Sequence, residues 1–428
     1  MSLLVVAAFF LSALRAQAAS FTYDDFVKLL QEKNITKIAD AIAALPEELR
    51  ANYTLMSDSM SAQPSSPTHP RAILFGQDAK FVVTFNGDPK HLNYDRLEVL
   101  QFREETNEFE LRFIKFEGNA PQFSAKNPRS CVNCHSANPK PIWGSYQDWP
   151  GTYGNDDRIS EKTAPEIYEG FQSFLAIQPQ HERYRHLIRD PKHRLYPFVD
   201  ADGEDLSLHL SHSLRPGNRL GNFFGRLMGR SAASLVRGSK YFQNHVATTL
   251  LGLISLGHNS LAYAGHPCLT PADLAEYDAQ LSKDFQARYA MADHPKLFER
   301  LAALKEPEQI RDFILQKLLF GPDYTWDMNR FARGGVVGSP VTYFLGEVNQ
   351  TSFVAARVMD YAVEMMPELK PYYIPAGADS WWTADYIRRV VAPYDTWYDA
   401  TGLLYRIDTA HDACEMLLVK AKAEWALP

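Results

Sequence analysis

The spacing of apolar residues changes along this chain, and this change constrains its fold more than any other feature. From residue 21 to 60 apolar side chains recur at helical spacing, as in Phe26, Leu29 and Leu30. Ser61 to Pro70 carries three prolines among serines, which cannot continue a helix. Beyond this connection the period falls to about two, which is the period of a strand. The sequence therefore predicts helices first and a β-sheet after them.

The block after this connection predicts four strands separated by turns. The segment that starts at Phe109 alternates apolar and charged residues, so one of its faces is expected to be buried and the other exposed to water. Asn86-Gly87 and the polar run from Glu104 to Asn107 are turn signals. We therefore expect a four-stranded antiparallel meander. Its strands are Arg71 to Phe75, Lys80 to Phe85, Arg96 to Phe102 and Phe109 to Phe116.

Helical patterns dominate from about residue 120 onward. Thr270 followed by Pro271 is typical of an N-cap and the first residue of a helix. The segment from Arg219 to Arg237 has helical periodicity but also interior glycines, so a glycine-rich loop is the alternative there. The predicted helices are at about Ala164 to Ile177, Gln180 to Arg189, Arg219 to Arg237, Val246 to Leu256 and Gly265 to Ala292.

The first 18 residues have the pattern of an export signal. An apolar run, Leu3 to Leu14, precedes Ala16-Gln17-Ala18, which is a small-x-small cleavage site. No Lys or Arg precedes the apolar run, and a buried N-terminal helix is the alternative. We expect residues 1–18 to be a signal peptide. After its removal no segment is apolar over the length that a bilayer requires, so we expect no integral membrane span.

Composition favours a globular protein over one that binds nucleic acid. The chain has 428 residues, of which 46% are hydrophobic and 22% charged, and its formal net charge is -7. The apolar fraction allows a substantial core, and the acidic balance gives no reason to expect nucleic acid as a partner. We predict an α+β fold that is mainly α-helical with a small antiparallel β meander. The predicted segments are 1–18 (signal peptide), 19–70 (helical), 71–119 (β meander) and 120–428 (mainly helical).

Cys131-Val-Asn-Cys134-His135 is the motif with the most specific chemistry. With 4 cysteines and 13 histidines in the chain, chance would place such a pentapeptide in roughly one of a thousand such chains. A structural zinc site would need further ligands at a characteristic spacing, and neither His209-Leu-Ser-His212 nor His266-Pro-Cys268 has it. A thioredoxin-like redox pair would need a strand before the motif and a helix N-terminus at it, whereas prolines flank the motif on both sides.

The motif resembles the C-x-x-C-H attachment site of c-type cytochromes. This resemblance implies one haem c, bound through thioethers at Cys131 and Cys134 in the segment 120–428, with His135 as the iron ligand. It also implies attachment in the periplasm, which agrees with the export signal. The resemblance covers only these two features. No methionine lies between Cys134 and Met228, and the chain is much larger than a simple class I cytochrome c.

The second axial ligand decides between functions. If a protein side chain closes the sixth position, the iron only passes electrons, and the expected role is one-electron transfer with a redox partner protein. If that position is open, a peroxidase-like haem-dependent oxidoreductase, or a haem-based redox sensor or binding module, is the alternative. The candidate ligands are His181, His186, His193, His209, His212, Met228 and Met328.

Three further groups of residues have two interpretations each. Trp143, Tyr146 and Trp149 follow the motif and are expected either to flank a porphyrin or to anchor a loop. Cys268 and Cys414 are expected either to form a disulfide or to be free thiols. A basic stripe on the predicted helix 219–237 is expected to bind haem propionates, to meet an acidic partner or to face solvent. Its members are Arg219, Arg226, Arg230 and Arg237.

Overall fold

The structure is a computed structural model, and it describes the chain in separate ranges. They are residues 20–59, 61–76, 78–135, 138–141, 151–153, 165–188, 216–259, 269–322, 358, 361–372 and 407–426. The predicted signal peptide, residues 1–18, lies outside the described residues, as do Trp143, Tyr146, Trp149 and Cys268.

The fold is α+β, as the sequence predicts. Three helices come first: α1 (Tyr23–Glu32), α2 (Ile38–Ala44) and α3 (Glu47–Ala51). Helix α1 begins at a capping box, in which the Thr22 hydroxyl accepts from the amide of Asp25 while the Asp25 carboxylate accepts from Thr22. A sheet of seven strands follows, in the order β6-β5-β4-β3-β2-β1-β7, with every neighbouring pair antiparallel. The strands are β1 (Tyr53–Met56), β2 (Arg71–Phe75), β3 (Phe81–Phe85), β4 (Arg96–Arg103), β5 (Glu108–Lys115), β6 (Gln122–Phe123) and β7 (Thr152–Tyr153).

The sheet is larger than the predicted meander. The four predicted strands correspond to β2 to β5, and the two-residue strands β6 and β7 extend its edges. Strand β1 lies in the segment for which we predicted helices only. Its four residues are all buried, because Tyr53 and Leu55 face one core while Met56 faces another. A strand buried on both faces shows no polar alternation, so its sequence lacks the period-two signal.

The rest of the described chain is helical. Gln180 to Arg189 was predicted to be a helix, but only one 3-10 turn, η1 (Tyr184–His186), forms there, because the His181 ring accepts the amides of Arg183 and Tyr184. The helix predicted over 219–237 is confirmed as α6, and Thr270 is confirmed as an N-cap. The helices are α4 (Arg129–His135), α5 (Pro165–Ile177), α6 (Pro216–Gly238), α7 (Lys240–Asn244), α8 (Val246–Asn259), α9 (Pro271–Arg288), α10 (Pro295–Ala302), α11 (Pro307–Phe320), η6 (Pro367–Tyr372) and α14 (Ile407–Trp425).

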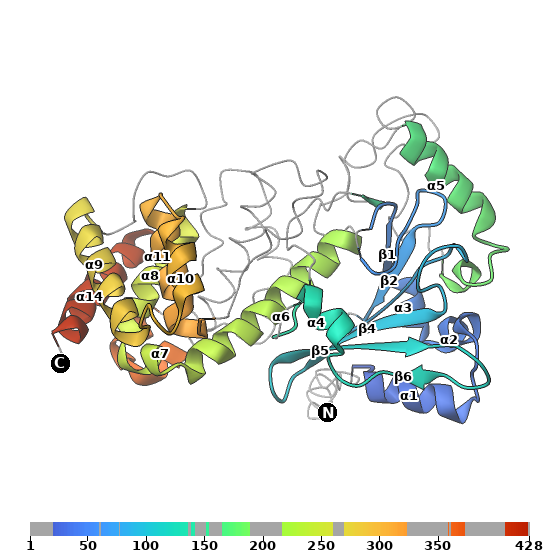
Figure 1. Ribbon diagram of the computed structural model, residues 1–428, viewed down its shortest axis with the longest axis horizontal. Helices are drawn as coiled ribbons and strands as arrows, with labels where there is room; N and C mark the ends of the chain where they lie inside the picture. The colour runs from blue at the N-terminus through green and yellow to red at the C-terminus, as the bar shows by residue number, and fades with distance from the viewer. Residues whose placement is uncertain are drawn as a thin grey trace, which may run out of the picture.

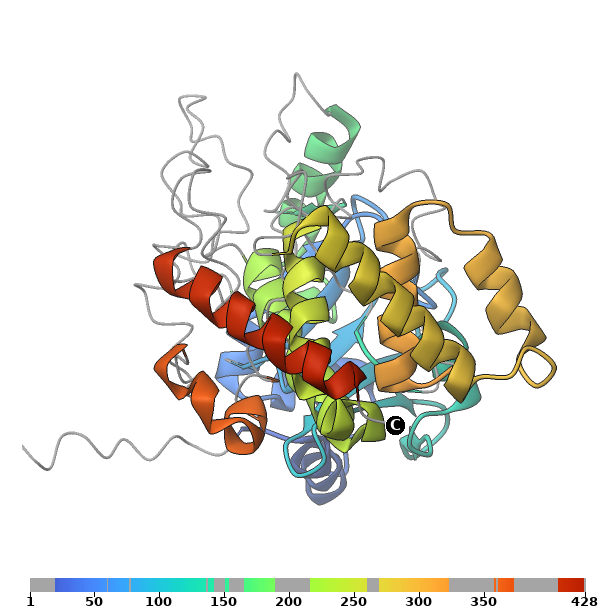
Figure 2. The same ribbon diagram turned by 90° about the vertical axis from the view of Figure 1, so that its left-hand side faces the viewer.

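Three cores hold these elements together. The first lies between one face of the sheet and helices α1, α2, α3 and α5. The second lies between the opposite face of the sheet and α6, and includes Phe102, Leu227 and Met228. The third is the centre of a helical bundle formed by α7 to α11 and α14, in which α14 lies across α8 (Figure 2).

Helix α6 belongs to two of these cores. Its first half supplies Leu220 and Phe224 to the second core, and its second half supplies Ala233 and Val236 to the third. A helix of 23 residues is about 35 Å long at 1.5 Å per residue. Figure 1 accordingly shows the sheet and the bundle at opposite ends of the molecule with α6 between them.

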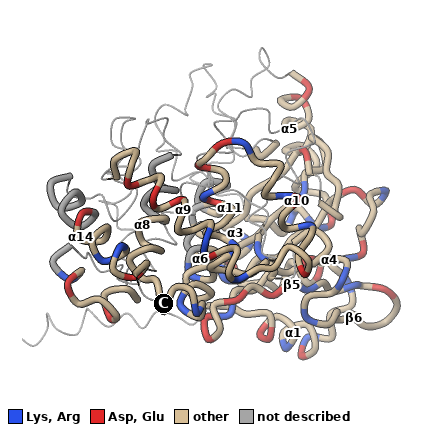
Figure 3. Tube along the Cα trace, turned by 60° about the vertical axis from the view of Figure 1, so that its left-hand side comes forward, with Lys and Arg blue, Asp and Glu red and all other residues tan. Residues whose placement is uncertain are grey.

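Two further features of the described chain are the distribution of its charged residues and the length of its apolar helices. Figure 3 shows acidic and basic residues interspersed along the described part of the trace. Of the helices that the structure describes, none combines the length and apolarity that a bilayer-spanning helix needs.

Candidate functional site

Helix α4 carries the motif, and the edge of the sheet fixes where α4 begins. The amide of Asn127 donates to the Leu111 carbonyl over 2.8 Å, and the Asn127 side-chain oxygen accepts from the Leu111 amide over 2.8 Å. Asn127 has a φ of 52°, in the left-handed region that Asn tolerates better than most residues. The chain, which returns along β5 after β6, therefore leaves the edge of the sheet at Asn127 and turns into α4, where the Pro128 carbonyl accepts from the Cys131 amide.

Helical geometry places the three chemical groups of the motif on one side of α4. Cys134 and His135 stand three and four residues after Cys131. At about 100° per residue the three side chains fall within an arc of about 100°. Figure 1 shows α4 against the sheet beside α6. The predicted site residues are therefore brought together on a short helix that rests on the second core.

The two cysteines differ in their surroundings. Cys131 is half-buried and packs against the second core, whereas Cys134 is exposed, and both are free thiols. Burial raises the pKa of the Cys131 thiol, and the nearby Glu98 carboxylate raises it further. Redox-active C-x-x-C pairs instead have a cysteine with a lowered pKa. The raised pKa of Cys131 does not match such a pair, although strand β6 precedes the motif and α4 begins two residues before Cys131, contrary to the sequence-based expectation.

One ring nitrogen of His135, Nδ1, forms a hydrogen bond within the described chain. Its Nδ1 lies 2.7 Å from the Lys140 carbonyl oxygen, and because a carbonyl can only accept, Nδ1 carries the proton and donates it. This tautomer leaves Nε2 with a lone pair, and no described residue bonds to Nε2. Burial lowers the pKa of the ring, against the opposing influence of the Lys140 carbonyl. The lowered pKa favours the neutral ring, and the hydrogen bond at Nδ1 orients it in the way that metal-ligating histidines are oriented.

A charged cluster lies on the sheet beside α4. The Glu98 carboxylate on β4 accepts from Arg71 on β2 over 3.0 Å and from Arg96 over 2.6 Å. These three side chains are only 12–19% exposed. Glu98 and Arg71 act electrostatically on His135, and Glu98 and Arg96 act on Cys131. We call Arg71, Glu98 and Arg96 the sheet cluster.

Neutral side chains complete the sheet cluster. The Arg71 guanidinium also donates to the Thr84 hydroxyl over 2.9 Å, and that hydroxyl donates to Gln63 over 2.8 Å. The Gln63 amide in turn donates to the Arg96 carbonyl over 2.8 Å. The Arg96 guanidinium lies 4.7 Å from the centre of the Phe113 ring. Buried Nε atoms of Arg71 and Arg96 nevertheless have no hydrogen-bond partner within the described part of the chain.

Sequence reasoning did not identify the sheet cluster, and it placed the basic residues of interest on α6. In the structure Arg230 pairs with Glu104 over 3.2 Å and lies over Phe102, and Arg237 pairs with Glu364 over 3.4 Å. The side chains of Arg219 and Arg226 lie outside what the structure describes. The sequence shows only isolated charges at the starts of two strands, at Arg71 and at Arg96-Leu-Glu98, which do not by themselves indicate a site.

The candidates for the sixth iron ligand that the structure describes make other contacts. His181 donates from Nε2 to the Gly87 carbonyl over 2.9 Å, and its Nδ1 accepts two backbone amides, so neither nitrogen is available. His186 has its Nε2 near Arg185, and Met228 is 4% exposed within the second core. The remaining candidates, His193, His209, His212 and Met328, lie outside the described residues.

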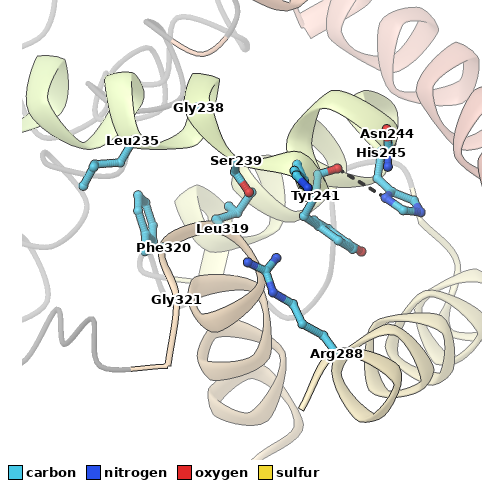
Figure 4. Close-up of a pocket in the computed structure, with 11 residues that line it drawn as sticks. Leu235, Gly238, Ser239, Tyr241, Asn244, His245, Arg288, Leu319, Phe320 and Gly321 are labelled. Carbon is cyan, nitrogen blue, oxygen red and sulfur yellow. Dashed lines mark hydrogen bonds between the residues drawn. The ribbon is translucent and has the colours of Figure 1, made fainter.

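A cavity of about 570 Å³ lies at the other end of α6, between α6, α7 and α11 (Figure 4). Arg288 and His245 line it, but each has a partner: Arg288 donates to the Leu318 carbonyl over 2.6 Å, and Nδ1 of His245 lies 3.2 Å from the Tyr241 carbonyl. No carboxylate lines this cavity. Its titratable side chains include Lys240, Tyr241 and His245, and no residue of the Cys131–His135 motif lines it.

Neither a search of the described residues for clusters of metal-binding side chains nor comparisons with known proteins identified another site. Among the residues that the structure describes, no three His, Cys, Asp or Glu side chains gather as a metal site would require. Neither a scan against protein-family models nor searches of curated proteins and of solved structures found a match for this chain.

Proposed function

We propose that this chain is a c-type cytochrome that carries one haem, bound through Cys131 and Cys134 with His135 as axial ligand, and that it transfers single electrons. The observation that carries the proposal is the state of His135: its Nδ1 donates to the Lys140 carbonyl and its Nε2 is left for a metal. The two free thiols on the same side of α4 supply the covalent anchors.

When bound, a c-type haem supplies an iron that cycles between Fe(III) and Fe(II) and two vinyl groups that react with thiols. Each cysteine S–H adds across one carbon–carbon double bond, so one C–S bond and one C–H bond form and no oxidant is consumed. Cys131, which packs against the second core, would hold the porphyrin beside the sheet. Cys134, which is exposed, is accessible to the attachment machinery.

His135 performs the remaining role. Its hydrogen bond to Lys140 fixes the ring orientation and increases the basicity of Nε2. The proposal also includes the compartment and the partner. Haem attachment and the predicted signal peptide, residues 1–18, are consistent with a periplasmic protein that exchanges electrons with a redox partner protein.

The test is covalent haem retention. The full chain is produced in a bacterial host with a haem c maturation system, and haem is detected on a denaturing gel. We expect a haem-positive band for the wild type and for Cys414→Ala, a control cysteine on α14, and no band for the double variant Cys131→Ala/Cys134→Ala. A wild-type band without haem overturns the proposal.

Electron transfer has its own test. The absorption spectra of the oxidised and reduced holoprotein are recorded with and without carbon monoxide. We expect a low-spin iron that carbon monoxide does not alter, because a carrier has both axial positions closed. A high-spin iron that binds carbon monoxide contradicts the carrier role and leaves the haem in place as the cofactor of an oxidoreductase or sensor.

A further inference from the structure

We propose that Arg71 and Arg96 of the sheet cluster bind a carboxylate of the porphyrin that α4 holds. This inference rests on the proposed function, because the carboxylate belongs to the haem that Cys131, Cys134 and His135 would carry. It assigns a cofactor-binding role to two residues of the sheet that the motif itself does not contain.

Charge is the first reason. The sheet cluster contains two guanidinium groups and one carboxylate, all largely buried, so it has an excess of one positive charge. Arg96 and Arg71 repel each other, and this repulsion is among the causes that lower the pKa of Arg71. A buried charge without a counter-ion is costly. One carboxylate would bring the cluster to neutrality.

Unused donors are the second reason. Glu98 accepts from one terminal nitrogen of each guanidinium, and the Nε atoms of Arg71 and Arg96 are buried without a partner within the described chain. Guanidinium N–H groups bind carboxylates in short, strong hydrogen bonds. The Nε atoms of Arg112 and Arg183 also lack a hydrogen-bond partner within the described chain. These two side chains, however, pack on Tyr23 and Tyr94, and each lies near a carboxylate, Arg112 at 3.4 Å from Glu110 and Arg183 at 3.7 Å from Glu182.

Position is the third reason. The charged groups that act electrostatically on His135 are Glu98 and Arg71, and those that act on Cys131 include Glu98 and Arg96. The sheet cluster is therefore next to both the thioether anchor and the iron ligand. The basic residues of α6 that have described side chains are already paired with carboxylates, Arg230 with Glu104 and Arg237 with Glu364. Among the described residues, the sheet cluster combines a largely buried excess charge with proximity to α4.

The experiment compares reduction potentials of holoproteins. The variants are Arg71→Gln and Arg96→Gln, with Arg71→Lys as the conservative replacement and Arg237→Gln as the matched control on α6. Losing a positive charge near the iron stabilises Fe(III) over Fe(II). We expect each Gln variant to shift the ratio of reduced to oxidised protein about tenfold toward oxidised, which is about 59 mV for one electron. We expect Arg71→Lys and Arg237→Gln to stay within threefold of the wild type.

Two results are told apart by the denaturing gel. If the wild type carries no covalent haem, the proposed function fails, and this inference with it. If all proteins carry haem and the Gln variants keep the wild-type potential, only this inference fails. A shift in Arg71→Lys as large as that in Arg71→Gln also overturns it, because it indicates a purely structural role.

A second readout serves if the Gln variants do not fold. Resonance Raman spectra of the wild type and of the Lys variants report the vibrational bands of the haem carboxylates. A lysine binds a carboxylate as a point charge and an arginine as a planar fork, so we expect these bands to shift in Arg71→Lys or Arg96→Lys. Identical bands in all three proteins overturn the inference.

Discussion

Asn127 determines where the motif helix sits, and its replacement gives a prediction whose size follows from the structure. Asn127 contributes a left-handed backbone, with a φ of 52°, and a side-chain acceptor for the Leu111 amide. Alanine loses both features, whereas glycine loses only the acceptor. An unpaired buried amide costs about 1–3 kcal/mol, and alanine in the left-handed region costs roughly 1–2 kcal/mol more than glycine. We expect Asn127→Ala to lower the free energy of unfolding by about 2–5 kcal/mol, and Asn127→Gly by about 1–3 kcal/mol.

Thiol labelling measures this effect at α4 itself. In protein made without haem, half-buried Cys131 should react slowly with a thiol reagent and exposed Cys134 rapidly. If α4 opens when its attachment to β5 weakens, a loss of about 2 kcal/mol corresponds to roughly thirtyfold faster labelling of Cys131. Cys134, already exposed, should change less than twofold and is the internal control.

Unfolding in urea, followed by far-UV circular dichroism, supplies the global comparison. We expect the order wild type, then Asn127→Gly, then Asn127→Ala, from most to least stable. If the alanine variant is as stable as the glycine variant, the backbone part of the reasoning is wrong. If Cys131 in both variants labels within twofold of the wild-type rate, Asn127 does not hold α4.

Three other predictions concern packing, helix capping and pH. Gly87→Ala should lower the free energy of unfolding by about 1–3 kcal/mol, because its Cβ would lie 1.9 Å from the Tyr184 hydroxyl. The control Gly76→Ala, whose Cβ would have no contact under 3.8 Å, should be neutral. Equal melting temperatures of the two variants would contradict this prediction. Glu424→Gln should lower the free energy of unfolding in urea by about 1–2 kcal/mol. The reason is that the Glu424 carboxylate on α14 accepts from the Ala247 and Thr248 amides in the first turn of α8, over 2.8 and 3.0 Å. An unchanged urea midpoint would contradict this capping role. Burial raises the pKa of Asp312 to about 6, so the native state binds the extra proton and stability falls as pH rises from about 4 through 6. Asp312→Asn should therefore gain about 1–3 kcal/mol over the wild type at pH 7.5 and nothing at pH 4; parallel pH profiles would contradict it.

Strands were predictable from the sequence where one of their faces is exposed to solvent, and helices where an N-cap is present. Apolar and charged residues alternate along strand β5, and Thr270 and Pro271 mark the N-cap and first residue of α9. Strand β1 was missed because burial on both faces removes the alternation. The helix predicted from Gln180 failed for a local reason, since the His181 ring takes the amides that a helix would have used.

The groups of the motif could be predicted as a site because Cys131, Cys134 and His135 follow one another along a single helix. Their spacing alone brings them to one side, whatever the rest of the fold does. What the sequence did not indicate is the carbonyl that sets the His135 tautomer. It comes from Lys140, five residues on, between Pro139 and Pro141 in a segment without a periodic pattern.

The sheet cluster was not predictable from a pattern, because strand register alone assembles it. Thr84 pairs with Glu98 across β3 and β4 and with Ile73 across β2 and β3, and Arg71, two residues before Ile73, shares its face. A slip of one residue in either pairing would send Glu98 or Arg71 to the opposite face of the sheet. In the sequence these residues are isolated charges at the starts of strands, where exposed charge is ordinary. Correct register converts them into a buried group with one excess positive charge beside α4, which is why the proposed carboxylate site depends on the sheet and not on the motif.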